Sequence, residues 1–120
     1  MSVAPEDDLH PATARLRLVP VLNALADTGR LAIVRALDAA GESDCTELRT
    51  VAGLTISKST FSHHQKVLRE AGLLHVRLHG SRRILSLRRH DLDEVFPGLL
   101  DAVLATDPER VLAPPPARAR

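Results

Sequence analysis

Residues 57–72, SKSTFSHHQKVLREAG, encode a complete α-helix with two unlike faces. Ser57 is a residue type that caps helix N-termini, and Gly72 supplies the left-handed conformation that commonly ends a helix. One face of this helix is apolar apart from a histidine, and the other is short, hydroxyl-rich and cationic. The apolar face comprises Phe61, His64, Val67, Leu68 and Ala71, and the polar face comprises Lys58, Ser59, Ser62, His63, Lys66 and Arg69.

The polar face has two interpretations, a solvated helix surface or a DNA-reading surface. Hydroxyl, imidazole and ammonium groups are those that meet base edges and phosphates in a major groove. The distribution of charge favours DNA. The net charge of the 120 residues is +1, yet residues 57–90 hold eight Lys and Arg against one Glu. Such segregation indicates one polyanion-binding face.

Aromatic residues bear on which nucleic acid is bound. Trp and Tyr are absent, and residues 57–90 contain one aromatic residue, Phe61, on the apolar side of its helix. Proteins that bind single strands stack bases on exposed aromatic side chains, so the pattern favours a reader of double-stranded DNA. The same scarcity predicts an aliphatic, helix-rich core.

Length and composition fit one folded domain. The acidic first residues lack the apolar core of a signal peptide, and no apolar run approaches the roughly 20 residues that span a bilayer. A single cysteine excludes an intrachain disulfide framework. We therefore expect a cytoplasmic protein with a disordered N-terminal arm over residues 1–11, a DNA-binding and dimerisation domain over residues 12–106, and a disordered Pro/Ala/Arg tail over residues 107–120.

Two helices are predicted near the start of this domain. Residues 16–26 have a helical apolar pattern, with Pro20 placed near the first turn of its regular part, where its missing N–H costs little. Asp27 is suited to cap a second helix over residues 28–40, which stops at Gly41.

A short third helix completes a helix-turn-helix pattern with residues 57–72. Asp44 and Glu47 form an Asp-x-x-Glu variant of the capping box at its start, and Gly53 ends it. Its predicted inner face consists of Leu48, Val51 and Ala52.

Beyond Gly72 the apolar period changes from that of a helix to that of a strand. Residues 74–79 and 82–87 are predicted strands joined by a turn at residues 79–81. This β-hairpin places Arg82, Arg83, Arg88 and Arg89 near its tip and returning strand. A basic hairpin behind a helix-turn-helix is a wing that contacts the DNA backbone or a minor groove.

A helical apolar stripe follows the hairpin, from Leu92 to Leu104, and Pro97-Gly98 interrupts it. We expect a short turn there and then a last helix from about Pro97. The predicted fold class is mainly α with a small β-hairpin, a winged helix-turn-helix with about five helices and a two-stranded wing.

Three stretches resemble the ArsR family of winged-helix repressors. Residues 23–37, NALADTGRLAIVRAL, resemble the family's opening, and residues 57–72 resemble its recognition helix. His79-Gly80-Ser81-Arg82 with Ser86-Leu87 look like its wing. The similarity covers roughly residues 16–104, and Thr28-Gly29 and Pro97-Gly98 depart from the usual pattern.

The resemblance implies a homodimeric DNA-binding repressor on an inverted-repeat operator, released by a small-molecule or metal inducer. It also implies dimerisation through the first and last helices, and both ends of the domain carry more aliphatic surface than a small domain readily buries alone. The predicted DNA-binding residues are Lys58, Ser59, Thr60, Ser62, His63, Lys66, His79, Ser81, Arg82 and Arg83. The predicted dimer-interface residues are Leu18, Leu22, Leu99, Leu100, Val103 and Leu104.

Many ArsR proteins sense metals through a Cys-x-Cys pair in the third helix. The aligned positions here are Asp44 and Thr46, with Cys45 between them. A soft-metal site needs two or three convergent thiolates, so we predict no cofactor and no metal, and an inert, buried Cys45. Weaker metal-site candidates are His75, His79 and His90, and His64 is expected to be a hydrogen-bonded structural histidine.

Three alternatives stay open to different degrees. A nickel- or zinc-responsive regulator of the same family would use His and Asp ligands. A winged helix used only for protein contacts would not need cations on both helix and wing. An enzyme is disfavoured, because no carboxylate is placed to orient His63 or His64 beside Ser62 and there is no Gly-rich phosphate loop.

Overall fold

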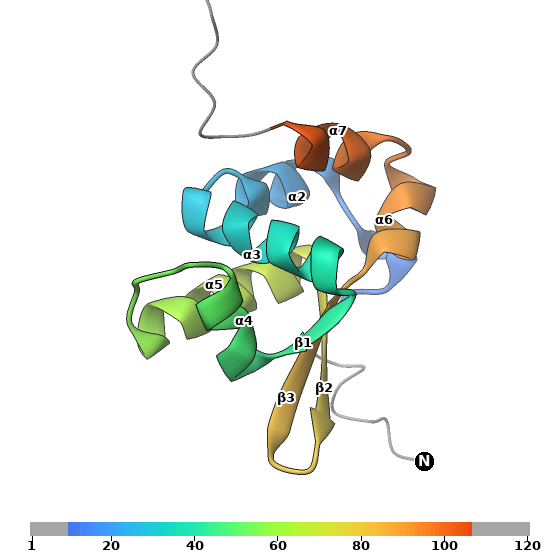
Figure 1. Ribbon diagram of the computed structural model, residues 1–120. Coiled ribbons are helices and arrows are strands. Elements are labelled where there is room, and N and C mark those ends of the chain that lie inside the picture. Colours follow the sequence, from blue (N-terminus) through green and yellow to red (C-terminus); the bar gives the residue numbers. More distant parts are fainter. Residues whose placement is uncertain (1–9, 107–120) are drawn as a thin grey trace, which may run out of the picture.

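The computed structural model describes residues 10–106. Residues 1–9 of the predicted arm and the whole predicted tail over residues 107–120 lie outside the described residues. The described part contains six α-helices, one 3-10 helix and one three-stranded antiparallel sheet (Figure 1). In chain order the elements are η1 (Thr13–Arg15), α2 (Leu18–Leu25), α3 (Thr28–Ala40), β1 (Glu42–Asp44), α4 (Cys45–Val51), α5 (Lys58–Ala71), β2 (Leu74–His79), β3 (Arg82–Leu87), α6 (Arg89–Val95) and α7 (Leu99–Ala105).

Local capping sets the limits of α3 and α4. Asp27 Oδ2 accepts a hydrogen bond from the backbone N–H of Arg30 at 3.0 Å, and α3 starts at the next residue, Thr28. Asp44 Oδ1 accepts from the N–H groups of Thr46 at 2.8 Å and Glu47 at 3.3 Å. Both aspartates satisfy N–H groups that lack a partner inside the helix, so both predicted caps are confirmed.

The first predicted helix begins two residues later than residues 16–26 suggest. Leu16 and Arg17 have extended backbone, and α2 starts at Leu18 with Pro20 in its first turn, as predicted. Leu16 is buried ahead of the helix, between η1 and α2. The sequence pattern extended the helix to Leu16 because Leu16 packs in the same core as the buried residues of α2.

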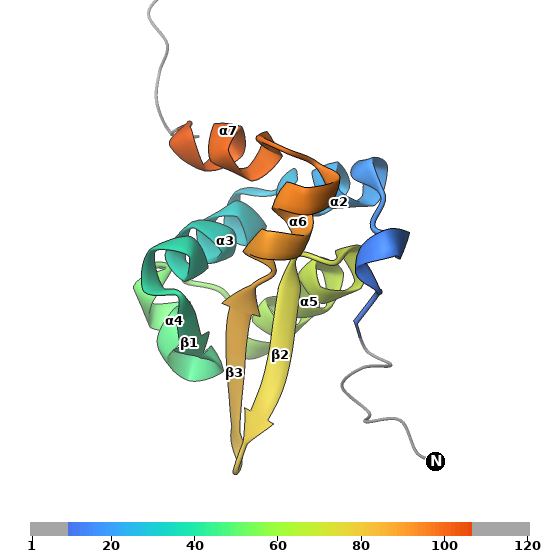
Figure 2. The same cartoon turned by 90° about the vertical axis from the view of Figure 1, so that its right-hand side faces the viewer.

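The sheet has a strand that the sequence analysis did not predict. Strand β1 pairs antiparallel with β3, opposite Ile84, Leu85 and Ser86, and the strand order is β1-β3-β2. The hairpin of β2 and β3 has the predicted limits and pairs Val76 with Leu85. The hairpin extends away from the helices, while β1 joins the carboxyl-terminal end of α3 to α4 (Figures 1 and 2).

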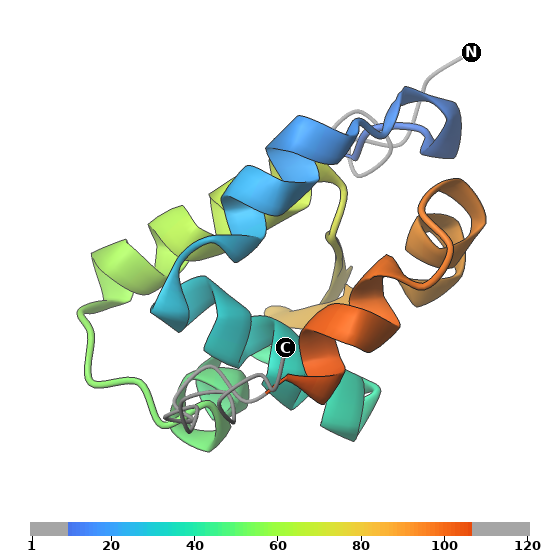
Figure 3. The same ribbon diagram turned by 90° about the horizontal axis from the view of Figure 1, so that it is seen from above.

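The stripe after the hairpin forms two helices rather than a turn and one helix. Helix α6 starts at Arg89, directly after β3, and α7 starts at Leu99. Between them Gly98 has a φ of 83°, a left-handed conformation that suits glycine. The break at Pro97-Gly98 is therefore real, and it turns the chain so that α7 lies over α3 (Figure 3).

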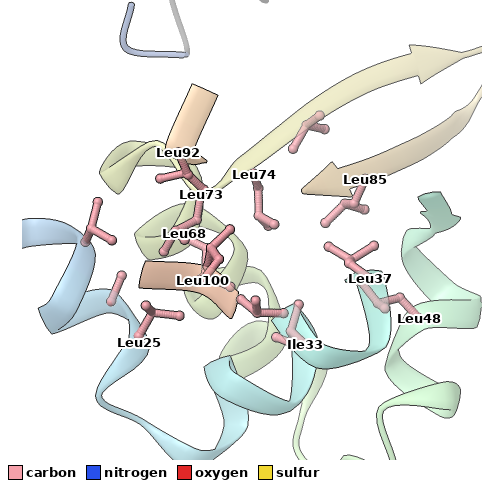
Figure 4. Packing of buried hydrophobic residues seen from close by; sticks show 14 of the residues in the cluster. Leu25, Ile33, Leu37, Leu48, Leu68, Leu73, Leu74, Leu85, Leu92 and Leu100 are labelled. Carbon is pink, nitrogen blue, oxygen red and sulfur yellow. The ribbon is translucent and has the colours of Figure 1, made fainter. Parts of the chain in front are cut away.

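The core is aliphatic, as predicted, and both the helices and the hairpin contribute side chains to it. Its largest fully buried side chains are nine leucine and isoleucine residues from α3 through α7 (Figure 4). Phe61 is the buried aromatic among the described residues, at 3% exposure. The prediction for Val51 was wrong. Its side chain is 62% exposed, although the sequence pattern placed it on the inner face of α4. The nine residues are Ile33, Leu37, Leu48, Leu68, Leu73, Leu74, Leu85, Leu92 and Leu100.

No helix of the described part is long and apolar enough to cross a membrane.

Candidate nucleic-acid interface

Helix α5 is held at both ends by its own residues. Ser57 Oγ accepts a hydrogen bond from the N–H of Thr60 at 3.1 Å, which confirms the predicted cap. Gly72 adopts φ 93° at the other end, and its N–H donates to Arg69 O at 3.0 Å. A Cβ at Gly72 would also lie 2.1 Å from Leu16 Cδ2, so both backbone and packing require glycine.

The inner face of α5 packs on three other elements. Phe61, His64 and Leu68 are buried as predicted. Gln65 is also buried, at 4% exposure, and its Nε2 donates to Cys45 Sγ at 3.0 Å. This contact ties the two helices of the helix-turn-helix together. The Cys45 side chain is only partly buried and lines a groove, whereas the sequence predicted a buried thiol.

A polar cluster fixes the rotation of α5 relative to α3. Arg30 Nη1 lies 3.4 Å from His64 Nδ1, and Asp27 Oδ2 lies 3.7 Å from His64 Nε2. Because a guanidinium only donates, Nδ1 is the acceptor and the ring proton lies on Nε2, facing Asp27. His64 is thus the structural histidine that the sequence predicted.

The cluster shifts the pKa of both titratable members downward. Burial lowers the pKa of His64, and the neighbouring Asp27 carboxylate partly opposes this. The N–H of Arg30 lowers the pKa of Asp27 because it hydrogen-bonds the charged form. A neutral imidazole between a guanidinium and a carboxylate is the state that these shifts favour at neutral pH.

The outer face of α5 is exposed at every predicted DNA-binding position. The side chains of Lys58, Ser62, His63 and Lys66 form no ion pair or hydrogen bond with the described residues. Thr60 Oγ1 accepts from Ser57 Oγ at 3.0 Å, and Ser59 Oγ lies 3.2 Å from the same hydroxyl. The prediction that Arg69 belongs to the exposed polar face was wrong. Its side chain is only 15% exposed and pairs with Glu70.

A groove of about 610 Å³ lies between α4 and the start of α5. Its rim carries the cations of Arg49 and Lys58 and the hydroxyl of Ser62. Arg49 Nη2 donates to Ile56 O at 2.6 Å, which holds the turn between the two helices. The lining of the groove is mostly apolar, and Lys58 and Ser62 are the residues that it shares with the outer face of α5.

The two wing arginines are not equivalent. His79, Ser81, Arg82 and Arg83 are all exposed. However, Arg82 Nε donates to Asp44 Oδ2 at 2.9 Å, and this contact lowers the pKa of the Asp44 carboxyl. Arg83 forms no ion pair or side-chain hydrogen bond with the described residues.

The carboxylate of Asp44 therefore caps α4 and holds the wing at once. Arg77 makes a parallel contact to Glu42 Oε1 at 2.9 Å. Neither ion pair was predicted from the sequence, because β1, which brings Glu42 and Asp44 beside the hairpin, was not predicted.

Arg88 and Arg89 are structural rather than part of a basic wing. Arg88 donates to Asp91 Oδ2 at 3.0 Å and to the backbone oxygen of Pro11 at 2.7 Å. Arg89 contacts three aspartates on three helices, so its charge is neutralised within the fold. These partners are Asp38 at 2.9 Å, Asp93 at 3.2 Å and Asp101.

The predicted dimer residues divide into two groups. Leu18 and Leu22 of α2 are 46% and 42% exposed, while Leu99, Val103 and Leu104 are partly buried against the core. The assignment of Leu100 to the dimer interface was wrong. Its side chain is 1% exposed and belongs to the core of the chain itself. Val19, at 74% exposure, was not predicted although α2 is apolar on all sides, which was the available signal.

The weaker metal-site histidines do not form a site in the structure. His75 stacks on His10 with ring centroids 4.4 Å apart, and His90 is exposed on α6 with its nearest carboxylate, Glu94, 3.8 Å away. No group of three His, Cys, Asp or Glu side chains in residues 10–106 is arranged to hold a metal ion. His79 remains an exposed side chain of the wing.

Comparisons with known proteins agree with this geometry. A family model described as a helix-turn-helix domain matches residues 25–77. The chain is 37% identical over 84 residues to the uncharacterized HTH-type transcriptional regulator YceK of Bacillus subtilis (strain 168). The aligned region covers 69% of this chain and 82% of the relative.

Two solved structures are also similar. One, a possible transcriptional regulator for arsenical resistance, is 30% identical with a TM-score of 0.57, over 72% of this chain and 84% of that chain. The other, an ArsR family transcriptional regulator, is 21% identical with a TM-score of 0.57, over 70% of this chain and 84% of that chain, and shows the same fold.

Proposed function

The chain belongs to the helix-turn-helix transcriptional regulators and has the winged-helix fold of the ArsR family, and on this premise we propose that it is a homodimeric repressor of an inverted-repeat operator. The observation that carries the proposal is the outer face of α5. It is polar, cationic and exposed, and the side chains of Lys58, Ser62, His63 and Lys66 form no ion pair or hydrogen bond with the described residues. A helix of this kind beside a basic hairpin suits a major groove flanked by phosphates.

The side chains have separate roles in this proposal. Ser59, Ser62 and His63 read base edges, with Thr60 beside them, because their groups lie on the face that enters the groove. Phosphates are bound by Lys58, Lys66 and Arg83. These contacts depend on charge and do not distinguish one base sequence from another. His79, Ser81 and Arg82 support the wing contact.

The dimer would form through α2 and α7. Exposed Leu18, Val19 and Leu22 make an apolar surface on α2 that water would otherwise cover, and Leu99, Val103 and Leu104 are the half-buried apolar residues of α7. A twofold, self-complementary interface here places two copies of α5 about one DNA turn apart, ~34 Å.

The test is fluorescence anisotropy on DNA from the promoter region of the protein's own gene, at several salt concentrations. Lys66→Ala should weaken operator and random DNA alike and reduce the slope of log affinity against log salt by about 0.9. Ser62→Ala and His63→Ala should instead reduce the preference for operator by ~1–3 kcal/mol per lost base contact.

Arg15→Ala is the matched control, since Arg15 is an exposed cation on η1 and belongs neither to α5 nor to the hairpin. It should leave both affinity and salt slope unchanged. Equal effects of Arg15→Ala and Lys66→Ala would mean that only net charge matters, and α5 would not be the reading helix. Salt-independent behaviour of the native protein would point to a protein-interaction module instead.

A further inference from the structure

The groove between α4 and the start of α5 has an apolar floor that the proposed DNA contacts do not use. Cys45, Leu54 and Phe61 line this floor. Phe61 belongs to the core, and Cys45 and Leu54 are partly buried against the core. The floor therefore offers contact to the apolar part of a ligand, which a DNA phosphate lacks.

The rim of the same groove is cationic. Arg49 and Lys58 line it, and no Asp or Glu of the described chain does. Arg49 Nη2 donates to Ile56 O at 2.6 Å, which holds the guanidinium in place, and its other N–H groups form no hydrogen bond or ion pair with residues 10–106. Lys58 is exposed, and its ammonium forms no ion pair within the same residues. Two cations without a carboxylate partner favour an anionic ligand group.

The groove has the size and the construction of a small-molecule site. Lys58, Phe61 and Ser62 are three and four residues apart, so they lie on one side of α5. Thr46 and Thr50 are four residues apart and form the facing side of α4 in the same way. The volume of about 610 Å³ lies within the range of about 300–1,000 Å³ that is usual for ligand pockets, which combine a mostly apolar lining with a few polar groups.

From these features we propose that the groove binds a small organic carboxylate with a compact apolar body. The carboxylate pairs with Arg49 and Lys58 at the rim, and the apolar body contacts Leu54 and Phe61 on the floor. A neutral apolar molecule leaves both cations without a partner, and a bare phosphate leaves the floor without contact. Only a ligand that has both parts uses the whole groove.

The consequence for DNA rests on the proposed function. Lys58 and Ser62 belong both to the groove and to the DNA-contacting face of α5. A bound carboxylate occupies the Lys58 ammonium and adds a negative charge where α5 approaches phosphates. The ligand therefore weakens DNA binding and acts as an inducer of the proposed repressor.

The first test uses 2-naphthoate as the probe. Its controls are 2-naphthamide, a neutral molecule of the same size, and inorganic phosphate. Each is titrated to about 10 mM into the isotope-labelled full chain, and the amide resonances of Thr46, Gly53 and Leu54 are followed by NMR. We expect saturable shifts with 2-naphthoate at a Kd of about 1 mM, which is typical of a ligand of this size. Both controls should bind at least about threefold more weakly, because each lacks one of the two kinds of contact.

Three variants locate the site. Thr50→Phe places a ring in the groove, whereas Val51→Phe places the same ring at the next residue of α4, which is exposed and does not line the groove. Binding of 2-naphthoate should be lost in Thr50→Phe and kept in Val51→Phe. Lys58→Gln, a change at an exposed position, should reduce the preference for 2-naphthoate over 2-naphthamide about two- to fivefold. The absence of saturable shifts in the native protein, equal affinities for the acid and the amide, or equal binding by the two ring variants would overturn the site.

Fluorescence anisotropy with promoter DNA tests the competition separately. Saturating 2-naphthoate should weaken DNA binding about two- to fivefold in the native protein and in Val51→Phe, and leave it unchanged in Thr50→Phe. Saturable binding of 2-naphthoate without any effect on DNA affinity would overturn the competition. A native protein that binds no DNA would overturn the proposed function and leave the NMR results intact.

Discussion

Replacing Asp27 by alanine should destabilise the domain more than its position in a surface turn suggests. Its Oδ2 accepts the Arg30 N–H at 3.0 Å and faces His64 Nε2 at 3.7 Å, so one carboxylate caps α3 and contacts the buried side of α5. Loss of an N-cap costs ~0.5–2 kcal/mol. The carboxylate is 37% exposed, so solvent screening limits its pairing with His64 to about 0.5 kcal/mol at most.

The free energy of unfolding should therefore fall by about 0.5–2.5 kcal/mol in Asp27→Ala, which lowers Tm by about 2–12 °C for a chain of this size. Urea denaturation followed by circular dichroism measures the change. Asp27→Asn is the control, since asparagine caps helices as well as aspartate, and it should cost less than about 0.5 kcal/mol. Equal losses in the two variants would refute the assignment of the stability to the cap.

The same cluster sets a pH dependence with a defined sign. Burial lowers the pKa of His64, so as pH falls through about 6.5 the unfolded chain binds a proton before the folded one, and stability declines. The lowered pKa of Asp27 adds stability above about pH 3.9, which is lost as pH falls through the folded value. Since Asp27 raises the pKa of His64, an NMR titration of Asp27→Asn should give a lower His64 pKa than the native protein.

Three further outcomes are expected. Leu22→Asp should yield a monomer at micromolar concentration by sedimentation, with much weaker operator binding, because Leu22 is an exposed apolar residue of α2. Arg83→Ala should reduce the salt slope of DNA binding by about 0.9 and Arg82→Ala by less, since Arg82 is already paired with Asp44; the reverse order would contradict this. Arsenite, cadmium and zinc should change operator affinity by less than about threefold, below the usual allosteric range, and Cys45→Ser should leave the affinity and its response to peroxide unchanged.

The sequence by itself determined the elements whose limits depend on near neighbours. Asp27 and Ser57 each cap a helix through an N–H three residues later, and Gly72 ends α5 through its own backbone. Such signals are complete within one turn, so the pattern predicted α3, α5 and the hairpin correctly. The exposed face of α5 followed from the same helical period.

Only the tertiary structure decided which charges remain available. The arginines of the hairpin region look alike in sequence, yet Arg82 and Arg89 are neutralised by carboxylates 38 and 51 residues away, and Arg83 is not. Strand β1, which carries Asp44, consists of three polar residues, so it lacks the alternation of apolar and polar residues by which a strand is predicted. Periodicity assigns a residue to a face, but it does not say which element covers that face, and this is why Leu100 is core and Val51 is exposed.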